Sequence, residues 1–194
     1  MIRARGLAKR YGAKRIFDGL DLDVERGAFV VVTGPNGSGK TTLMRLVAGL
    51  VAPTAGELTV NAERAQLGFL GHEALVYRDL TAMENLQLYA RLYRVAEARE
   101  RIGMLLERFD LWEVRNERAG AYSRGMLQRL ALCRAFLHEP TLLLLDEPYS
   151  ALDVEGAELL DRELDARRTT ATFLVATHDP VRLEPFASGR LAFA

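Results

Sequence analysis

Apolar and polar residues follow two different periods along the chain, and the dominant period changes twice. Up to about residue 60 the pattern is strand-like, with short alternating segments such as Phe17–Val24, which are typical of half-exposed strands. From about Thr81 to Phe136, apolar residues instead recur with helical spacing. From Thr141 onward, strand-like and helix-like segments alternate again. The pattern predicts an α/β core with a helical insert.

Individual elements can be placed within these three stretches. The insert carries two apolar helical faces, formed by Leu86, Tyr89, Ala90 and Tyr93 and by Ile102, Leu105, Leu106 and Phe109. We expect strands at 29–33, 66–70, 142–145, 172–176 and 190–193, and helices at 41–50 and 155–167. No repeat or linker-like tract divides the chain. We therefore predict one domain over residues 1–194, with a helical subdomain at approximately 73–136 inserted into the α/β core.

Composition narrows the function classes only modestly. Lys+Arg and Asp+Glu both total 26 among 194 residues, so net charge gives no argument for a nucleic-acid partner. The single cysteine, Cys133, excludes an intrachain disulfide and a multi-cysteine metal site. The N-terminus lacks the apolar core of a signal peptide, and no apolar run approaches membrane-spanning length. We expect a soluble, cytoplasmic chain.

The segment Gly34–Thr41 has the P-loop form G-x-x-x-x-G-K-[ST]. It follows the apolar run Phe29–Thr33 and precedes a helical pattern. The motif needs this order of strand, loop and helix, whereas a simple glycine-rich turn does not need it. Glycines let backbone N–H groups curl around phosphate oxygens, and the helix N-terminus adds positive potential. Lys40 would reach the β- and γ-phosphates, and Thr41 would offer its hydroxyl to Mg²⁺. The predicted nucleotide contacts are Gly34, Pro35, Asn36, Gly37, Ser38, Gly39, Lys40, Thr41 and Thr42.

A second phosphate-site motif follows the apolar run Leu142–Leu145. Asp146 stands at the carboxyl end of a buried parallel strand, where α/β proteins bind ligands. An aspartate there can hold the Mg²⁺ that Thr41 also ligates. The next residue, Glu147, can polarise an attacking water. Taken alone, two adjacent acids could equally be a solvated strand end, and the P-loop upstream favours the phosphate site.

A third segment, Tyr122–Ala135, resembles the signature sequence of ATP-binding cassette (ABC) ATPases, LSGGQ followed by x-Q-R-x-x-x-A-R-A. The positions that match this pattern are Ser123, Gly125, Gln128, Arg129, Arg134 and Ala135. The departures are Tyr122 for leucine, Arg124 for the first glycine, Met126 for the first glutamine and Cys133 for an alanine. The resemblance extends over essentially the whole chain. It implies an α/β fold with a P-loop NTPase core of ABC ATPase type, N-terminal antiparallel strands and a helical signature subdomain.

Three further segments are similar to the family's motifs in the family's order. Tyr11 stands where an aromatic ring stacks on adenine, and a π-face suits any base. Ser150–Asp153 resembles the D-loop. His178 resembles the switch histidine that holds the γ-phosphate and the attacking water, although it could instead be a cap before Asp179-Pro180.

The resemblance also implies a mechanism, with ATP and Mg²⁺ as cofactors. Glu147 would be the general base, with Lys40 and His178 as further catalytic groups, and Thr41 and Asp146 would be the metal ligands. In the family, two subunits form a dimer on nucleotide binding. Each ATP then lies between one P-loop and the other subunit's signature helix, which brings Ser123, Gly125 and Asp153 to the nucleotide.

His72 is the informative departure from the family pattern. The frame Leu67–His72 places a histidine where the family has a glutamine that touches Mg²⁺ or water. A neutral imidazole can still accept from water or ligate a metal, so His72 is a catalytic candidate; alternatively, it only fills the position. The sequences of Gly71–Glu73 and Leu80–Leu86 are similar to those of the ATP-binding subunit of the haem exporter used in cytochrome c maturation.

The implied function is an ATP-hydrolysing subunit that powers an ABC transporter. Its partners would be integral membrane subunits, which would hold the chain on the inner face of the cell membrane, and its cargo would be haem. Two alternatives stay open: a subunit of another exporter, or a non-transport ABC ATPase acting on nucleic acid or ribosomes. Long coiled coils, tandem cassettes and basic tracts are absent from the sequence, so we expect no nucleic-acid partner.

Overall fold

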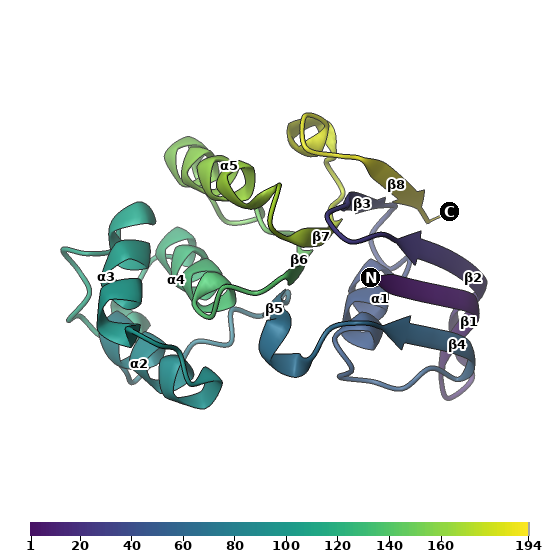
Figure 1. Ribbon diagram of the computed structural model, residues 1–194, viewed down its shortest axis with the longest axis horizontal. Helices are drawn as coiled ribbons and strands as arrows, with labels where there is room; N and C mark the ends of the chain where they lie inside the picture. Colours follow the sequence, from purple (N-terminus) through teal and green to yellow (C-terminus); the bar gives the residue numbers. More distant parts are fainter. Residues whose placement is uncertain (194) are drawn as a thin grey trace.

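A five-stranded parallel sheet forms the centre of the computed structural model, which describes residues 1–193 (Figure 1). Its strand order is β5-β6-β7-β3-β8, and every strand pair is parallel. The strands are β3 (Phe29–Thr33), β5 (Leu67–Leu70), β6 (Leu142–Asp146), β7 (Thr172–Ala176) and β8 (Gly189–Ala192). The three central strands are almost continuously apolar because both faces of the sheet are covered.

A second, antiparallel sheet of three strands lies at the N-terminal side and has the order β2-β1-β4. Its strands are β1 (Ile2–Tyr11), β2 (Lys14–Val24) and β4 (Ala55–Val60). Helix α1 (Lys40–Val47) lies between the two sheets, where its Leu43 and Met44 are fully buried against residues of both. The expected N-terminal antiparallel strands and the helix after the P-loop are therefore confirmed.

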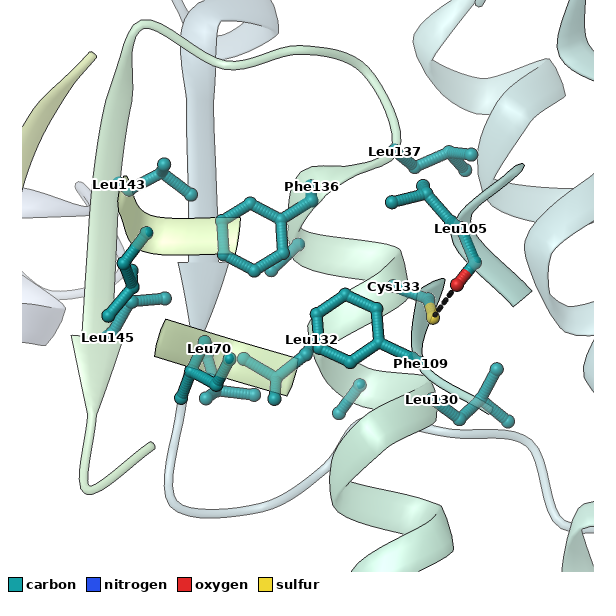
Figure 2. Close-up of a cluster of buried hydrophobic side chains, with 14 of the residues drawn as sticks. Leu70, Leu105, Phe109, Leu130, Leu132, Cys133, Phe136, Leu137, Leu143 and Leu145 are labelled. Carbon is teal, nitrogen blue, oxygen red and sulfur yellow. Dashed lines mark hydrogen bonds between the residues drawn. The ribbon is translucent and has the colours of Figure 1, made fainter. Parts of the chain in front are cut away.

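The insert between β5 and β6 contains three helices, which gather on the left of Figure 1. They are α2 (Ala82–Tyr93), α3 (Ala98–Arg108) and α4 (Arg124–Phe136). Figure 2 shows Phe136 of α4 facing Leu143 and Leu145 of β6, with Phe109 packed on the other side. Helix α5 (Val154–Arg167) covers the same face of the sheet. The chain also has three short 3₁₀ turns within residues 1–193, namely η1 (Arg64–Gln66), η2 (Ala119–Ala121) and η3 (Val181–Leu183).

The bounds expected for five elements differ from the structure. Three differ by one residue: the strand expected at 66–70 begins at Leu67, the strand expected at 142–145 ends at Asp146, and the helix expected at 155–167 begins at Val154. The helix expected at 41–50 begins at Lys40 and ends at Val47. It ends early because Gly49 adopts a left-handed φ of 69°, and the N–H groups of Gly49 and Leu50 then return to the carbonyls of Leu46 and Arg45, as in a Schellman motif. The final strand, expected at 190–193, lies one residue earlier, at Gly189–Ala192.

Candidate functional site

A cavity of about 550 Å³ opens at the carboxyl ends of β3 and β6. We call it the phosphate cavity. It brings together residues from five separate segments, because the carboxyl ends of parallel strands meet at one edge of the sheet. The predicted site residues that line it are Asn36, Gly37, Gly39, Lys40, Thr41, Thr42, His72, Asp146, Glu147 and His178.

Glycine backbone angles and close packing set the shape of the P-loop. Gly34 and Gly39 have φ values of 145° and 112°, which favour glycine. A Cβ on Gly39 would also lie 2.9 Å from Ile16 Cγ2 and from the Phe17 ring, so β2 approaches the loop too closely for a side chain. The Lys40 ammonium spans the loop, donating to Gly34 O at 2.7 Å and Pro35 O at 3.2 Å. This cation is 6% exposed and lines the phosphate cavity.

Asp146 is a buried carboxylate without a partner. It is 2% exposed, and neither of its oxygens has a hydrogen-bond partner within residues 1–193. Burial raises its pKa, and the neighbouring Thr41 hydroxyl and the charges of His72 and Lys40 lower it in part. An isolated buried carboxylate is costly, and a divalent cation would relieve that cost. The oxygen donors of Asp146 and Thr41 fit Mg²⁺.

Glu147 and His178 form a pair at the mouth of the cavity. Glu147 Oε2 lies 2.8 Å from His178 Nδ1 and 3.4 Å from Thr177 Oγ1. The Glu147 side chain is 16% exposed and the His178 side chain 61%, so the pair faces the solvent that would supply water. Glu147 also has a φ of 49°, a region that non-glycine residues rarely adopt. Its N–H donates to Ala176 O at 2.8 Å, which holds this conformation.

The alternative interpretation of His178 as a cap gains no support within residues 1–193, because the turn η3 that follows has no side-chain cap. The Asp179 N–H donates to Thr177 Oγ1 at 3.1 Å, and the Val181 N–H donates to Asp179 Oδ1 at 3.2 Å. The His178 ring instead contacts Glu147.

Other predicted site residues lie outside the phosphate cavity. Ser123 is exposed and caps α4, its Oγ accepting from Met126 N at 3.2 Å. Gly125 follows it, and a Cβ there would lie 3.1 Å from Ala151 O. Asp153 caps α5 by accepting from Gly156 N at 2.8 Å. These residues have local roles within the chain and do not reach its own P-loop cavity.

Tyr11 also lies away from the phosphate cavity, at the end of β1. Its ring is 45% exposed, and the Lys9 ammonium lies 4.8 Å from the ring centroid. The remaining predicted contacts, Gly34, Pro35 and Ser38, belong to the P-loop but do not line the cavity.

Sequence reasoning missed several residues that line the cavity, namely Lys14, Ile16, Arg45 and Ser150. Arg45 could have been found, because it lies one helical turn after Thr41 and Thr42. Ser150 was named only as the start of the D-loop segment. Lys14 and Ile16 carry no signal, because only the packing of β2 against the P-loop brings them there.

Comparisons with known proteins agree on one family. The family model described as "ABC transporter" matches residues 17–150. The daunorubicin resistance ATP-binding protein DrrA3 of Streptomyces coeruleorubidus is 42% identical over 172 residues, which are 82% of this chain and 54% of that protein. The ABC transporter ATP-binding protein NatA of Bacillus subtilis (strain 168) is 36% identical over 82% of this chain and 70% of its own length. The chain thus spans between half and about 70% of these relatives.

Solved structures show the same likeness in three dimensions. An ATP-binding subunit of an ABC transporter has a TM-score of 0.90 at 28% identity, covering 99% of this chain and 85% of that one. A dimeric ATP-binding cassette in a post-hydrolysis state, bound to ADP and Pi, has a TM-score of 0.86 at 27% identity, covering 100% and 94%. Across residues 1–193, none of the helices has the length and apolarity needed to span a bilayer.

Proposed function

The chain belongs to the ABC transporter family, and we propose that residues 1–194 form one ATP-binding domain that hydrolyses ATP to power a transporter. The observation that carries this proposal is the Glu147–His178 pair, with a 2.8 Å contact, at the mouth of the cavity that the P-loop forms. A base, a phosphate-binding cation and a buried carboxylate in one cavity are the parts that phosphoryl transfer to water requires.

Each residue has a separate task in this proposal. The P-loop N–H groups and the Lys40 ammonium bind the phosphates, and Thr41 and Asp146 would hold Mg²⁺, which neutralises charge on the β- and γ-phosphate oxygens. Glu147 accepts a proton from the attacking water at a carboxylate oxygen. His178 holds that carboxylate through Oε2, and the family resemblance implies that the same histidine would hold the γ-phosphate.

We propose a homodimer with ATP between its subunits, and the position of Ser123 supports it. The residue begins α4 in an exposed position outside the chain's own phosphate cavity. A helix N-terminus favours an anion, so this end of α4 suits the γ-phosphate held by a second copy. The dimeric cassette with bound ADP and Pi supports such an arrangement by likeness.

The test of hydrolysis is Glu147→Gln, which keeps shape but cannot accept the proton. We expect the rate of phosphate release to fall by about 10²–10⁴-fold, with nucleotide affinity retained. Glu158→Gln is a matched control, because Glu158 lies in an exposed pair with Arg162 on α5. A Glu147→Gln protein that turns over ATP at the parent rate would remove Glu147 from the mechanism.

The partners and the cargo form the finer part of the proposal. We propose that the chain docks on integral membrane subunits at the inner face of the cell membrane. We propose haem as the cargo, exported for c-type cytochrome biogenesis, because of the sequences of Gly71–Glu73 and Leu80–Leu86. Relatives carry other names, including daunorubicin resistance, so a different exporter is the second candidate.

Isolation of the native complex from membranes tests the partners. Co-purified membrane subunits support a transport motor, and haem-dependent stimulation of ATP turnover in that complex supports the cargo. Co-purified ribosomes or DNA would support a non-transport ABC ATPase and overturn the proposal.

A further inference from the structure

The outer edge of β5 is held by the side chains of Arg134 and His138, which the mechanism above does not use. We call these two contacts the β5 lock. β5 lies at the end of the parallel sheet, and among residues 1–193 it pairs only with β6. Successive backbone groups of a strand point to opposite sides. Gln66 O accepts from Thr141 N on the β6 side, so the carbonyls of Leu67 and Phe69 face the outer edge. An exposed strand edge leaves such groups without ladder partners.

Arg134 of α4 and His138, which lies two residues after α4, have side chains that satisfy these carbonyls. Arg134 Nη2 donates to Phe69 O at 2.8 Å, and His138 Nε2 lies 3.0 Å from Leu67 O. Arg134 is 7% exposed, and its guanidinium lies 5.3 Å from the centroid of the Tyr89 ring of α2. Burial lowers the pKa of His138. Its Nδ1 is buried without a partner within residues 1–193, which fits a neutral ring that donates from Nε2.

The backbones of α4 and β5 also touch directly. A Cβ on Gly68 would lie 2.4 Å from Ala135 O and 2.7 Å from Pro140 Cγ. No side chain therefore separates the helix from the strand at this point. Because close-packed surfaces transmit displacement rather than absorb it, a shift of α4 moves β5 with it.

β5 leads straight into the phosphate cavity. Only Leu70 and Gly71 separate the locked Phe69 from His72, and His72 lines the cavity with Asp146 and Glu147. Leu70 and Gly71 are both buried. We therefore expect a displacement of Phe69 to be passed on to His72.

We propose that Arg134 is a positioning residue for the ATPase site: by fixing the outer edge of β5 it sets the place of His72, and it links that place to the helix that begins at Ser123. The kinetic part of this proposal rests on the proposed function, whereas its structural part concerns His72 alone. Arg134→Lys tests it, because a compact ammonium cannot lie on the Tyr89 ring and reach Phe69 O as a planar guanidinium does.

Imidazole NMR gives the direct readout, since the chain contains three histidines. We expect the His72 ring signal to shift in Arg134→Lys with and without nucleotide. The matched control is Arg129→Lys, also on α4, because Arg129 donates to the carbonyls of Phe109 and Asp110 inside the helical insert. In the control the His72 signal should keep the parent position. An unmoved His72 signal in Arg134→Lys would overturn the proposal.

Kinetics distinguish positioning from general stability. We expect Arg134→Lys to lower kcat for ATP by about fivefold with nucleotide affinity unchanged, and to cause no further loss in a His72→Ala background, because coupled residues act non-additively. Equal losses in both backgrounds would overturn the proposal. A parent protein without ATP turnover would instead contradict the proposed function, and the NMR result would still decide the place of His72.

A second variant covers the case in which Arg134→Lys does not fold. His138→Phe retains a ring against Tyr93, where the two rings now stack with centroids 3.9 Å apart, but loses the donor to Leu67 O. We expect the same direction of shift in the His72 signal, and no shift would overturn the lock.

Discussion

The phosphate cavity and the signature end of α4, which we define as Ser123–Gly125, are built in opposite ways. In the cavity, the ammonium of Lys40 and the carboxylate of Asp146 are almost fully buried, at 6% and 2% exposure. At the signature end, Ser123 and Arg124 are exposed, and the Ser123 hydroxyl contacts only its own helix. The cavity brings a buried cation and a buried carboxylate together within one chain, whereas the signature end presents its groups outward.

This difference bears on the order in which the phosphate cavity and the signature end contact the nucleotide. The cavity has a buried charge without a partner and a strained Glu147, both of which are costs that a bound Mg²⁺-nucleotide would offset. The signature end has no such cost, because its helix is capped and solvated. We infer that the cavity binds nucleotide first and that the signature end engages it only when a second copy arrives.

The largest expected effect is a loss of nucleotide affinity on substitution of Lys40 in the phosphate cavity. Lys40→Ala removes a charge-assisted contact to phosphate, which is worth about 1.5–3 kcal/mol, so nucleotide affinity should fall by about 10–100-fold or more. Titration with a fluorescent ATP analogue measures this, with circular dichroism to check the fold. Unchanged affinity would show that the lysine does not bind the phosphates.

Asp146→Asn tests the unpaired charge in the cavity. Because burial raises the pKa of Asp146, this group contributes stability below its ordinary pKa of 3.8 that is lost as pH rises through the higher folded value. At pH 7 without nucleotide, Asp146→Asn should therefore raise Tm by about 2–4 °C for each kcal/mol gained.

The same variant should gain less Tm from Mg²⁺ and ATP than the parent does. Asp165→Asn is the control, because Asp165 lies in an exposed pair with Arg168. A lower Tm for nucleotide-free Asp146→Asn at pH 7 would contradict the account of a costly charge.

At the signature end, Ser123→Ala should affect stability and leave affinity unchanged. Loss of the helix cap costs about 0.5–2 kcal/mol, which urea unfolding measures, while Ser123→Asn should retain the cap. Because Ser123 lies outside the cavity, the affinity of the monomer for ATP should equal that of the parent. A loss of affinity similar to that of Lys40→Ala would remove the distinction between the phosphate cavity and the signature end.

The smallest effect concerns the departures within the signature. Arg124 adds bulk to a turn that must approach phosphate closely, and Met126 packs partly against the core. Replacing both with the family residues, Arg124→Gly and Met126→Gln, should raise basal ATP turnover a few-fold, about 1 kcal/mol or less in barrier. An unchanged rate would show that the signature end accepts these residues as they are.

The sequence predicted the cavity better than its surroundings. The strands 29–33 and 172–176 were correct to the residue, because apolar runs bounded by turn residues leave little freedom in a doubly covered sheet. Asp146 and most of the P-loop line one cavity, and sequence spacing pointed to them because this spacing is typical of phosphate sites. The end of α1 was placed late, because a Schellman ending depends on backbone angles that propensity does not give.

Contacts that arise only from tertiary packing escaped sequence reasoning. The sequence named Glu147 and His178 separately, but their 2.8 Å contact depends on a left-handed Glu147. Lys14 reaches the cavity only because β2 packs on the P-loop. Arg134 matched a sequence pattern, yet its hydrogen bond to Phe69 O at the edge of β5 is seen only in the structure.

Size measurement of Glu147→Gln in the presence of ATP and Mg²⁺ tests most directly whether the phosphate cavity and the signature end meet across two copies of the chain. ATP that is bound and not consumed should bridge one phosphate cavity to the other copy's signature end. The account predicts a dimer for Glu147→Gln, mainly monomer for the parent, and monomer for Glu147→Gln combined with Lys40→Ala. A Glu147→Gln protein that binds ATP, does not hydrolyse it and remains monomeric would contradict the claim that two copies of this chain complete the site by themselves.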